Sequence, residues 1–448
     1  IALFYLLGYG VILINQPEFN MQGILIVAGA VGLTLFQYGV LTAFFPGIDR
    51  AVLLIANFLC AVGLVVLYRI NPDTALKQLI WMAIGMVGMV IALVLVRYGR
   101  VWPQLTWLYI LASFGLLAIT LVFGRSSYGA NLSFSIAGFA FQPSEFVKVV
   151  LVMGMAAMLY HYRGLPTILL MGVYVGTCLI LLLLSKDLGA ALLYAGTAIC
   201  MLYAGTSSKL LTGTALGVVA GGSVAAYYLF SHVRVRVALW KNPWAMYEGQ
   251  GYQVVQGLIA IASGGLFGLG LTNGMPMSIP VRQSDYIFAV ICEEFGWIIG
   301  ICLVALYLVF IVRGAIIAMG ARNSFDAVLA IGCVSMITLQ SFINIGGVIK
   351  LIPLTGITLP FVSYGGSSMI TCFVILGVLE GIAVKNADAD ALEFEENRYV
   401  DDEYEYEEEY VEPYENAYLE EEVSRQRPRD TQTYEAPRRS RRTGRRNP

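Results

Sequence analysis

An acidic and a basic residue open one of the long apolar runs of this chain. Glu145 and Lys148 lie in the sequence Gln-Pro-Ser-Glu-Phe-Val-Lys at 142–148, and a spacing of three residues places them on one face of a helix. Charged groups inside an apolar span are costly unless paired and often serve a function. We therefore consider two interpretations: the pair binds a substrate, or its charges only neutralise each other and lock helices together.

Two aspartates stand directly before other apolar runs. Asp187 follows Ser-Lys at the start of one run, where a carboxylate stabilises the positive end of a helix dipole, so capping is favoured over catalysis. Asp285 lies where a long loop becomes an apolar run that carries Glu293-Glu294. A carboxylate at a partly dehydrated position binds protons more tightly and can act as a general base, although aspartates at helix starts are commonly caps.

Basic residues gather in the loop that precedes Asp285. Arg234 and Arg236 are two residues apart, and Lys241 follows them. If the segment is extended, the two arginines point the same way, which would suit a two-armed grip on phosphate. His232 has no second histidine or cysteine nearby, so we interpret it as a polar loop residue and not as a metal ligand.

A segment rich in proline, glycine and hydroxyl groups joins the last two apolar runs. It reads Ile-Pro-Leu-Thr-Gly-Ile-Thr-Leu-Pro-Phe-Val-Ser-Tyr-Gly-Gly-Ser-Ser over 352–368 and includes Ser363 and Ser367, with Lys350 just before it. Irregular backbone of this kind cannot face lipid, so it must be buried in protein or line a cavity.

The composition indicates that helices in a membrane position these residues. Of 448 residues, 58% are hydrophobic and 13% are charged, whereas soluble domains have about a quarter charged residues. Most of the apolar runs are long enough to cross a bilayer as helices, and they lack the alternation of barrel strands. The predicted helices lie near residues 1–14, 21–45, 48–68, 75–97, 102–123, 144–160, 165–185, 187–206, 210–230, 287–312, 325–350 and 363–384.

The first run, 1–14, is too short to span alone, and we expect it to be a truncated helix. A signal peptide is the competing interpretation, but neither a basic leader nor a small-residue cleavage site precedes the next run. The seven cysteines lie within apolar runs without a CxxC pair, which disfavours metal clusters and disulfides.

The amino-acid composition of the chain changes from apolar to strongly charged after Lys385. Residues 386–448 carry 19 of the 30 acidic residues and end in an arginine-rich stretch. Such charge blocks bury too little apolar surface to fold, so we expect a disordered tail. A solubilising tether is the favoured role over a docking segment, and the final arginines could touch anionic lipid on the cytoplasmic side.

Without this tail the chain is cationic. It then holds 18 basic against 11 acidic residues, and basic residues lie on both sides of the predicted spans, so counting alone leaves the orientation open. If the side with Arg97, Arg313 and Arg322 is cytoplasmic, the excess of cations on the outer side calls for an anionic ligand there.

Five motifs in a fixed order resemble those of the SEDS family (shape, elongation, division and sporulation) of bacterial cell-wall glycosyltransferases, of the RodA and FtsW type. They are QPSExxK at 142–148, DLG at 187–189, the RV, NPW, GxGYQ and GGxxGxGL loop, the segment that begins SDYIFA at Ser284, and TLPFVSYGGSS at 358–368. The resemblance runs from about Ile48 to Val384. It implies an all-α polytopic membrane protein.

The resemblance also implies a domain arrangement. Residues 1–47 would be extra N-terminal helices, and 48–385 a ten-helix core with a large extracellular loop at 231–286. Residues 386–448 would be a cytoplasmic tail.

Polymerisation of lipid II into glycan strands, on the outer face of the cytoplasmic membrane, is the activity that the resemblance implies. The partner would be a class B penicillin-binding transpeptidase, and no nucleic acid is expected. Asp285 matches the catalytic base of the family. The residues assigned to the substrate by the same resemblance are Arg234, Arg236, Lys241, Glu145, Lys148, Asp187, Lys350, Ser363 and Ser367. A divalent cation, Mg²⁺ or Mn²⁺, could assist at the pyrophosphate.

Two other function classes compete with this one. A flippase for lipid-linked precursors would also need polar groups within the bundle, but it should show internal repeats, which we do not detect. A scaffold for division or sporulation partners would use the tail and could dispense with Asp285. The sequence leaves open whether the protein serves division, elongation or sporulation.

Overall fold

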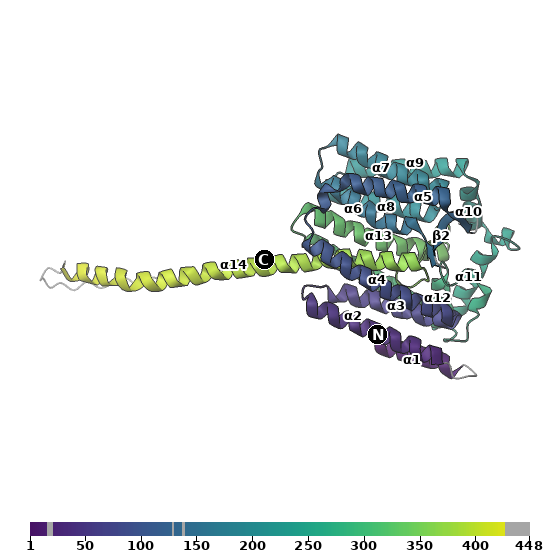
Figure 1. Ribbon diagram of the computed structural model, residues 1–448, viewed down its shortest axis with the longest axis horizontal. Coiled ribbons are helices and arrows are strands. Elements are labelled where there is room, and N and C mark those ends of the chain that lie inside the picture. The colour runs from purple at the N-terminus through teal and green to yellow at the C-terminus, as the bar shows by residue number, and fades with distance from the viewer. Residues whose placement is uncertain (16–20, 128–129, 137–138, 426–448) are drawn as a thin grey trace, which may run out of the picture. The chain divides into compact units, whose positions relative to one another are not determined.

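The computed structural model describes residues 1–15, 21–127, 130–136 and 139–425, and helices dominate it (Figure 1). Ten helices of this described part are long and apolar enough to cross a membrane, and α1 and α5 are shorter apolar helices. These twelve are α1 (Ala2–Ile14), α2 (Met21–Phe44), α3 (Arg50–Ile70), α4 (Pro72–Tyr98), α5 (Thr106–Phe123), α6 (Pro143–Tyr160), α7 (Leu165–Leu184), α8 (Leu188–Thr206), α9 (Lys209–Leu229), α12 (Ile287–Met319), α13 (Ser324–Val348) and α14 (Gly366–Arg425). The predicted helical membrane fold is confirmed.

The two long connections have structure of their own. The first contains a small antiparallel sheet in the order β1 (Arg125–Ser127), β2 (Ala130–Ile136) and β3 (Phe139–Phe141). The second contains the helices α10 (Ser231–Lys241) and α11 (Tyr252–Gly264) with short turns of 3₁₀ helix at Pro243–Met246 and Pro276–Ser278. A third such turn, Trp102–Gln104, precedes α5. These elements are too short to stand out as apolar runs.

The helix α12 is interrupted at Gly296, whose φ of 82° and ψ of 173° are not helical. The break frees backbone groups that must find partners at membrane depth. The segment 265–270 supplies them: two of its amides donate to the carbonyls of Glu293 and Glu294, at 2.9 and 3.0 Å, and its first carbonyl accepts from the Trp297 amide at 2.9 Å. A Cβ at position 296 would lie 2.3 Å from a carbonyl oxygen of this segment, so the position requires glycine.

Two buried carboxylates of α12 hold the same loop in place. Glu294 pairs with Arg69 at the end of α3, with 3.2 Å between Oε1 and Nε. The Arg69 guanidinium also donates to the Thr272 carbonyl at 3.0 Å, and Glu293 accepts from the Met275 amide at 3.1 Å. These contacts join α3, α12 and the loop between α11 and α12.

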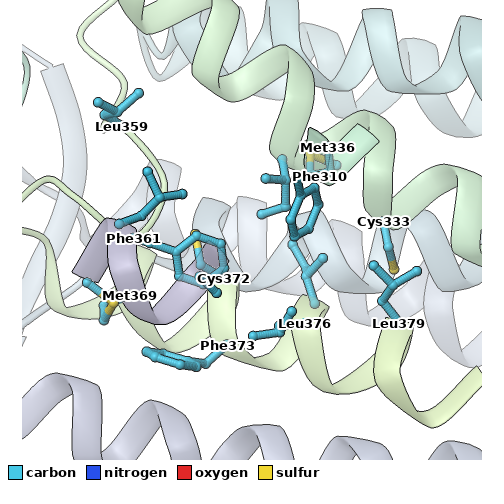
Figure 2. Packing of buried hydrophobic residues seen from close by; sticks show 14 of the residues in the cluster. Phe310, Cys333, Met336, Leu359, Phe361, Met369, Cys372, Phe373, Leu376 and Leu379 are labelled. Atoms are coloured by element: carbon cyan, nitrogen blue, oxygen red, sulfur yellow. The ribbon is translucent and has the colours of Figure 1, made fainter. Parts of the chain in front are cut away.

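Apolar packing anchors the segment between α13 and α14. Figure 2 shows Phe361 of this segment beside Cys372 of α14. The rings of Phe361 and Phe373 meet edge to face, with centroids 5.6 Å apart. Residues 359–363 of the irregular segment are buried against helices, so the backbone of this part is shielded from lipid, as predicted.

The packed unit extends slightly past Lys385, the predicted start of the tail. Asn386 donates to the Ile317 carbonyl at 2.9 Å, and Asp388 pairs with Arg97 at 2.9 Å. The compact unit ends at Ala389. The helix α14 then continues to Arg425, which differs from the expectation of a disordered tail from Asn386, because this stretch is rich in Glu, a strong helix former. Residues 426–448 lie outside the described part.

Candidate active site

A cavity of about 990 Å³ brings together six of the predicted site residues. Its wall comes from the starts of α6 and α8, from α10 and α11, and from the segments 280–285 and 347–358. The six predicted residues in this wall are Glu145, Lys148, Asp187, Arg236, Asp285 and Lys350. Five stretches of the chain that are separate in sequence therefore meet at one polar hollow.

Asp285 is partly buried at the cavity wall, one residue before the N-cap of α12. That N-cap is Tyr286, and α12 has no side-chain capping bond, so the competing interpretation of Asp285 as a cap does not hold. Burial raises the pKa of the carboxyl group to about 6, against the opposing effects of Ser284 and the Arg236 guanidinium. A base of this strength accepts a proton more readily than an ordinary aspartate does.

Asp187 caps α8, as predicted. One carboxylate oxygen accepts from the Ala190 amide at 3.0 Å. The other accepts from the Ser144 hydroxyl at 3.0 Å and from the Gln142 amide at 3.4 Å. Burial raises the pKa of Asp187, and these hydrogen bonds oppose the rise. Its oxygens are committed to protein partners, so its function in the structure is to join α6 to α8 at the cavity wall.

The two arginines of α10 diverge, because the extended backbone that would let them point the same way is not present. They lie on a helix instead of an extended segment, and two helical residues are roughly 200° apart around the axis. Arg236 lines the cavity and donates to the Leu354 carbonyl at 2.9 Å. Arg234 is exposed outside the cavity and donates to the Tyr228 carbonyl at 3.1 Å.

Three further predicted residues do not line the cavity. Lys241 ends α10 and is exposed. Ser363 is buried, donates to the Ser284 carbonyl and accepts from the Leu359 amide. Ser367 accepts from the Gln142 amide at 3.1 Å. The two serines therefore hold the backbone of the wall instead of facing a substrate.

Glu145 and Lys148 combine the two roles considered for them. Both line the cavity, and they form a buried ion pair of 2.6 Å. Lys148 also donates to Gln340 of α13 at 2.9 Å, and Glu145 accepts from Thr371 of α14 at 3.2 Å. The pair is thus satisfied within the protein and links α6 to α13 and α14 beneath the cavity.

Positive charge exceeds negative charge around the cavity. The lining cations are Lys148, Lys186, Arg236 and Lys350, and the lining carboxylates are Glu145, Asp187 and Asp285. His232 also lines it, and burial together with the neighbouring cations lowers its pKa. The cavity therefore suits a polar ligand with negative charge.

The site also depends on two amide residues that sequence reasoning missed, Gln340 and Asn344 of α13. Gln340 donates to the Thr358 carbonyl at 3.0 Å, and Asn344 donates to the carbonyls of Asp285 and Ile357. Both are buried polar residues within a span, and this rarity was the signal that could have identified them.

A divalent cation fits the protein side chains poorly. Within the part of the chain that the structure describes, no three His, Cys, Asp or Glu residues are grouped closely enough to hold a metal ion. The Asp187 carboxylate, which lines the cavity, is already occupied by hydrogen bonds. We therefore derive no step that passes through a metal.

Residues 50–388 match the family model described as cell cycle protein, named for FtsW, RodA and SpoVE. The peptidoglycan glycosyltransferase RodA of Mycobacterium tuberculosis is 32% identical over 390 residues, which cover 79% of this chain and 82% of that protein. The probable peptidoglycan glycosyltransferase FtsW of Bacillus subtilis is 35% identical over 371 residues, 75% of this chain and 90% of that one. Stage V sporulation protein E of the same organism is 32% identical over 358 residues, which cover 75% of this chain and 96% of that protein.

Solved structures are similar in fold as well. One, described as structural coordination of polymerization and crosslinking by a peptidoglycan synthase complex, has a TM-score of 0.64 and 25% identity, covering 76% of this chain and 98% of that one. The structure of RodA of Thermus thermophilus has a TM-score of 0.55 and 25% identity, and the match covers 75% of this chain and 96% of that one.

Proposed function

Since this chain belongs to the FtsW, RodA and SpoVE family of cell cycle proteins and is a peptidoglycan glycosyltransferase, we propose that it polymerises lipid II at the outer face of the cytoplasmic membrane. One observation carries the proposal. A proton-accepting carboxylate that caps no helix, Asp285, lines a large cavity with an excess of cations, and Arg236 is one of its neighbours there.

Asp285 acts as the general base in this proposal. It takes the proton from the 4-hydroxyl of the acceptor GlcNAc as that oxygen forms a bond to the anomeric carbon of the donor MurNAc. The bond from that carbon to the phosphate oxygen breaks, and its electron pair leaves with undecaprenyl pyrophosphate. A second acid is not required, because pyrophosphate is a good leaving group.

Cavity cations stabilise the charge that gathers on the leaving group. Arg236 presents the N–H groups that Leu354 does not use, and Lys186 and Lys350 add positive charge at the same wall. Fixed donors of this kind stabilise a developing anion most effectively in a partly dehydrated site. This assignment replaces Arg234 and Lys241 in the predicted pyrophosphate site, because neither lines the cavity.

The helix directions support the proposed orientation. Asp285 stands at the start of α12, whereas Asn386 of α14 meets Ile317 at the other end of α12. The start of the tail and the cavity are therefore on opposite sides of the bilayer if α12 crosses it. We place the cavity outside and the tail in the cytoplasm, which also puts Arg97, Arg313 and Arg322 on the inner side.

A transpeptidase partner is the second part of the proposal. One solved structure of similar fold is described as a peptidoglycan synthase complex that coordinates polymerization and crosslinking. We propose that this chain likewise acts beside a class B penicillin-binding protein, which would cross-link the strands that it makes.

Incubation of the purified full chain with lipid II tests the activity. We expect a ladder of glycan strands on a gel, and no ladder from Asp285→Asn. Asp73→Asn, an exposed aspartate in the first turn of α4, is the matched control and should polymerise normally. Movement of lipid II between leaflets without polymer would indicate a flippase, and neither result would indicate a scaffold. Either outcome would overturn the proposal.

A further inference from the structure

Asn344 links the backbone of the candidate base to an adjacent part of the cavity wall. This residue of α13 is 2% exposed. Its side-chain amide donates to the Asp285 carbonyl at 3.1 Å and to the Ile357 carbonyl at 2.7 Å. One NH₂ group therefore joins two segments that both line the cavity.

The main chain before α12 is held at three consecutive carbonyls. The Gln283 carbonyl accepts from the Tyr364 amide at 2.8 Å, the Ser284 carbonyl accepts from the Ser363 hydroxyl, and the Asp285 carbonyl accepts from Asn344. The first two donors belong to the segment between α13 and α14. Asn344 is the donor from a membrane-spanning helix, which is the more rigid support.

The surroundings of the Asp285 carboxylate depend on the segment that Asn344 holds. Gly356 precedes Ile357 and has a φ of 78°. A Cβ built on Gly356 would lie 3.5 Å from Oδ2 of Asp285 and 4.0 Å from Nη1 of Arg236. The carboxylate thus lies against bare backbone, and a shift of this backbone would admit water beside it.

Asn344 makes these contacts at a cost to stability. Its carboxamide oxygen is buried and finds no partner among the described residues. An unsatisfied buried acceptor destabilises a fold, and such an atom calls for a functional explanation. A residue that served packing alone would be apolar here.

We propose that Asn344 is a positioning residue, which fixes the main chain of Asp285 against Gly356 and Ile357 and so holds the carboxylate at the cavity wall near Arg236. The inference rests on the proposed polymerase function. Other charged or titratable groups around the same cavity are Glu145, Lys148, Lys186, Asp187, His232, Tyr252 and Lys350.

Steady-state polymerisation of lipid II by Asn344→Ala, measured across pH, tests the proposal. We expect kcat to fall about 10- to 100-fold while KM changes less than about threefold, because the base is misplaced but the cationic wall remains. The acidic limb of the kcat profile should move from pH about 6 toward pH about 4, the range of a hydrated aspartate. A purely structural role would lower the yield of active protein without moving this limb.

Ser341→Ala is the matched control. Ser341 is also buried on α13, one turn earlier, and its hydroxyl donates to the Ile337 carbonyl of its own helix. This variant should have the kcat of wild type, and the acidic limb of its kcat profile should stay at the same pH.

If Asn344→Ala is not recovered folded, Asn344→Leu replaces it: it has a similar volume but no donor for the two carbonyls and no charge, and the same shift is expected. A kcat within twofold of wild type, or a loss of kcat with the limb unmoved, would overturn the inference. An inactive wild-type protein would instead overturn the proposed function.

Discussion

Asp187 and Asp285 show how a shift of one residue separates a capping carboxylate from a candidate base. Both precede membrane-spanning helices, but Asp187 is itself the N-cap of α8, whereas Asp285 stands one residue before the N-cap of α12. Asp187 accepts a hydrogen bond from the Ala190 amide in the first turn of its helix, whereas α12 has no side-chain cap. The second carboxylate is therefore left to face the cavity.

Replacing this base should abolish polymerisation. Asp285→Asn is nearly isosteric but accepts no proton, and a general base commonly contributes about 10²- to 10⁴-fold in rate. Gel analysis of lipid II products at matched protein amounts measures the loss. Asp187→Asn should instead reduce thermal stability or yield, because its NH₂ group cannot accept the hydrogen bonds from Ser144 and Gln142. Near wild-type polymerisation by Asp285→Asn would remove Asp285 from the mechanism.

The raised pKa of Asp285 also predicts a gain in stability for the same variant. The folded carboxyl group has a pKa of about 6 and the unfolded one about 4, so stability falls as pH rises between these values and the cost persists above them. Asp285→Asn removes the cost. Its Tm should exceed that of wild type at about pH 8, and the difference should vanish near pH 4. Equal Tm values at pH 8 would contradict the shift.

Arg236 and Arg234 should respond differently to substitution. Arg236→Ala removes a cavity cation and the bond to Leu354, so kcat/KM for lipid II should fall at least about tenfold. Arg234→Ala removes the same charge outside the cavity and should change kcat/KM less than about threefold. Kinetics at matched expression compare the two. Equal losses would show that net charge, and not the placement of Arg236, matters.

At the scale of elements, the apolar runs predicted the twelve apolar helices well, and the motifs identified the segments that meet at the cavity. The helical state of α10 was missed because a short basic segment carries no apolar periodicity. The partners of Asn344 and the break in α12 were beyond prediction, because both depend on segments distant in sequence. The roles of Ser363 and Ser367 could not be assigned for the same reason.

The α12 break predicts a glycine requirement. Gly296→Ala would force a side chain into positive φ and against the segment 265–270, so it should lower Tm or the yield of folded protein, with a strain of roughly 1–3 kcal/mol. Gly172→Ala on α7 is the control, because a Cβ there meets nothing within 4 Å. Thermal unfolding in detergent compares them. A Gly296→Ala protein as stable as the control would show that the break tolerates a side chain.

For the whole molecule, the packed unit and the tail meet within α14. The first four residues after Lys385 belong to the compact unit, which ends at Ala389. The composition change therefore begins slightly before the structural boundary. Contacts of Asn386 and Asp388 explain the difference, since each reaches a group elsewhere in the bundle.

Truncation should distinguish the composition boundary after Lys385 from the structural boundary after Ala389. A chain that ends after Ala389 should polymerise lipid II like the full chain, because it retains the cavity and every contact of the compact unit. A chain that ends after Lys385 should remain active but have a slightly lower Tm, because it loses the Arg97 pair, worth about 0–1 kcal/mol where exposed. Loss of polymer in the first truncation would give the tail a direct role in synthesis.

The pair between Arg69 and Glu294 has a consequence for how the protein is made. Ribosomes produce α3 long before α12, and α12 brings two adjacent carboxylates into the bilayer. An unpaired acidic group at the centre of a span raises the free energy of insertion by about 2.5–3.5 kcal/mol on insertion scales. An arginine that is already in the membrane and pairs with it reduces that cost. Because α3 is made first, it can pair with α12 as α12 inserts, and α12 alone would insert into lipid poorly. Insertion of α12 by the translocon should accordingly weaken in Arg69→Ala, whether or not the protein is catalytically competent.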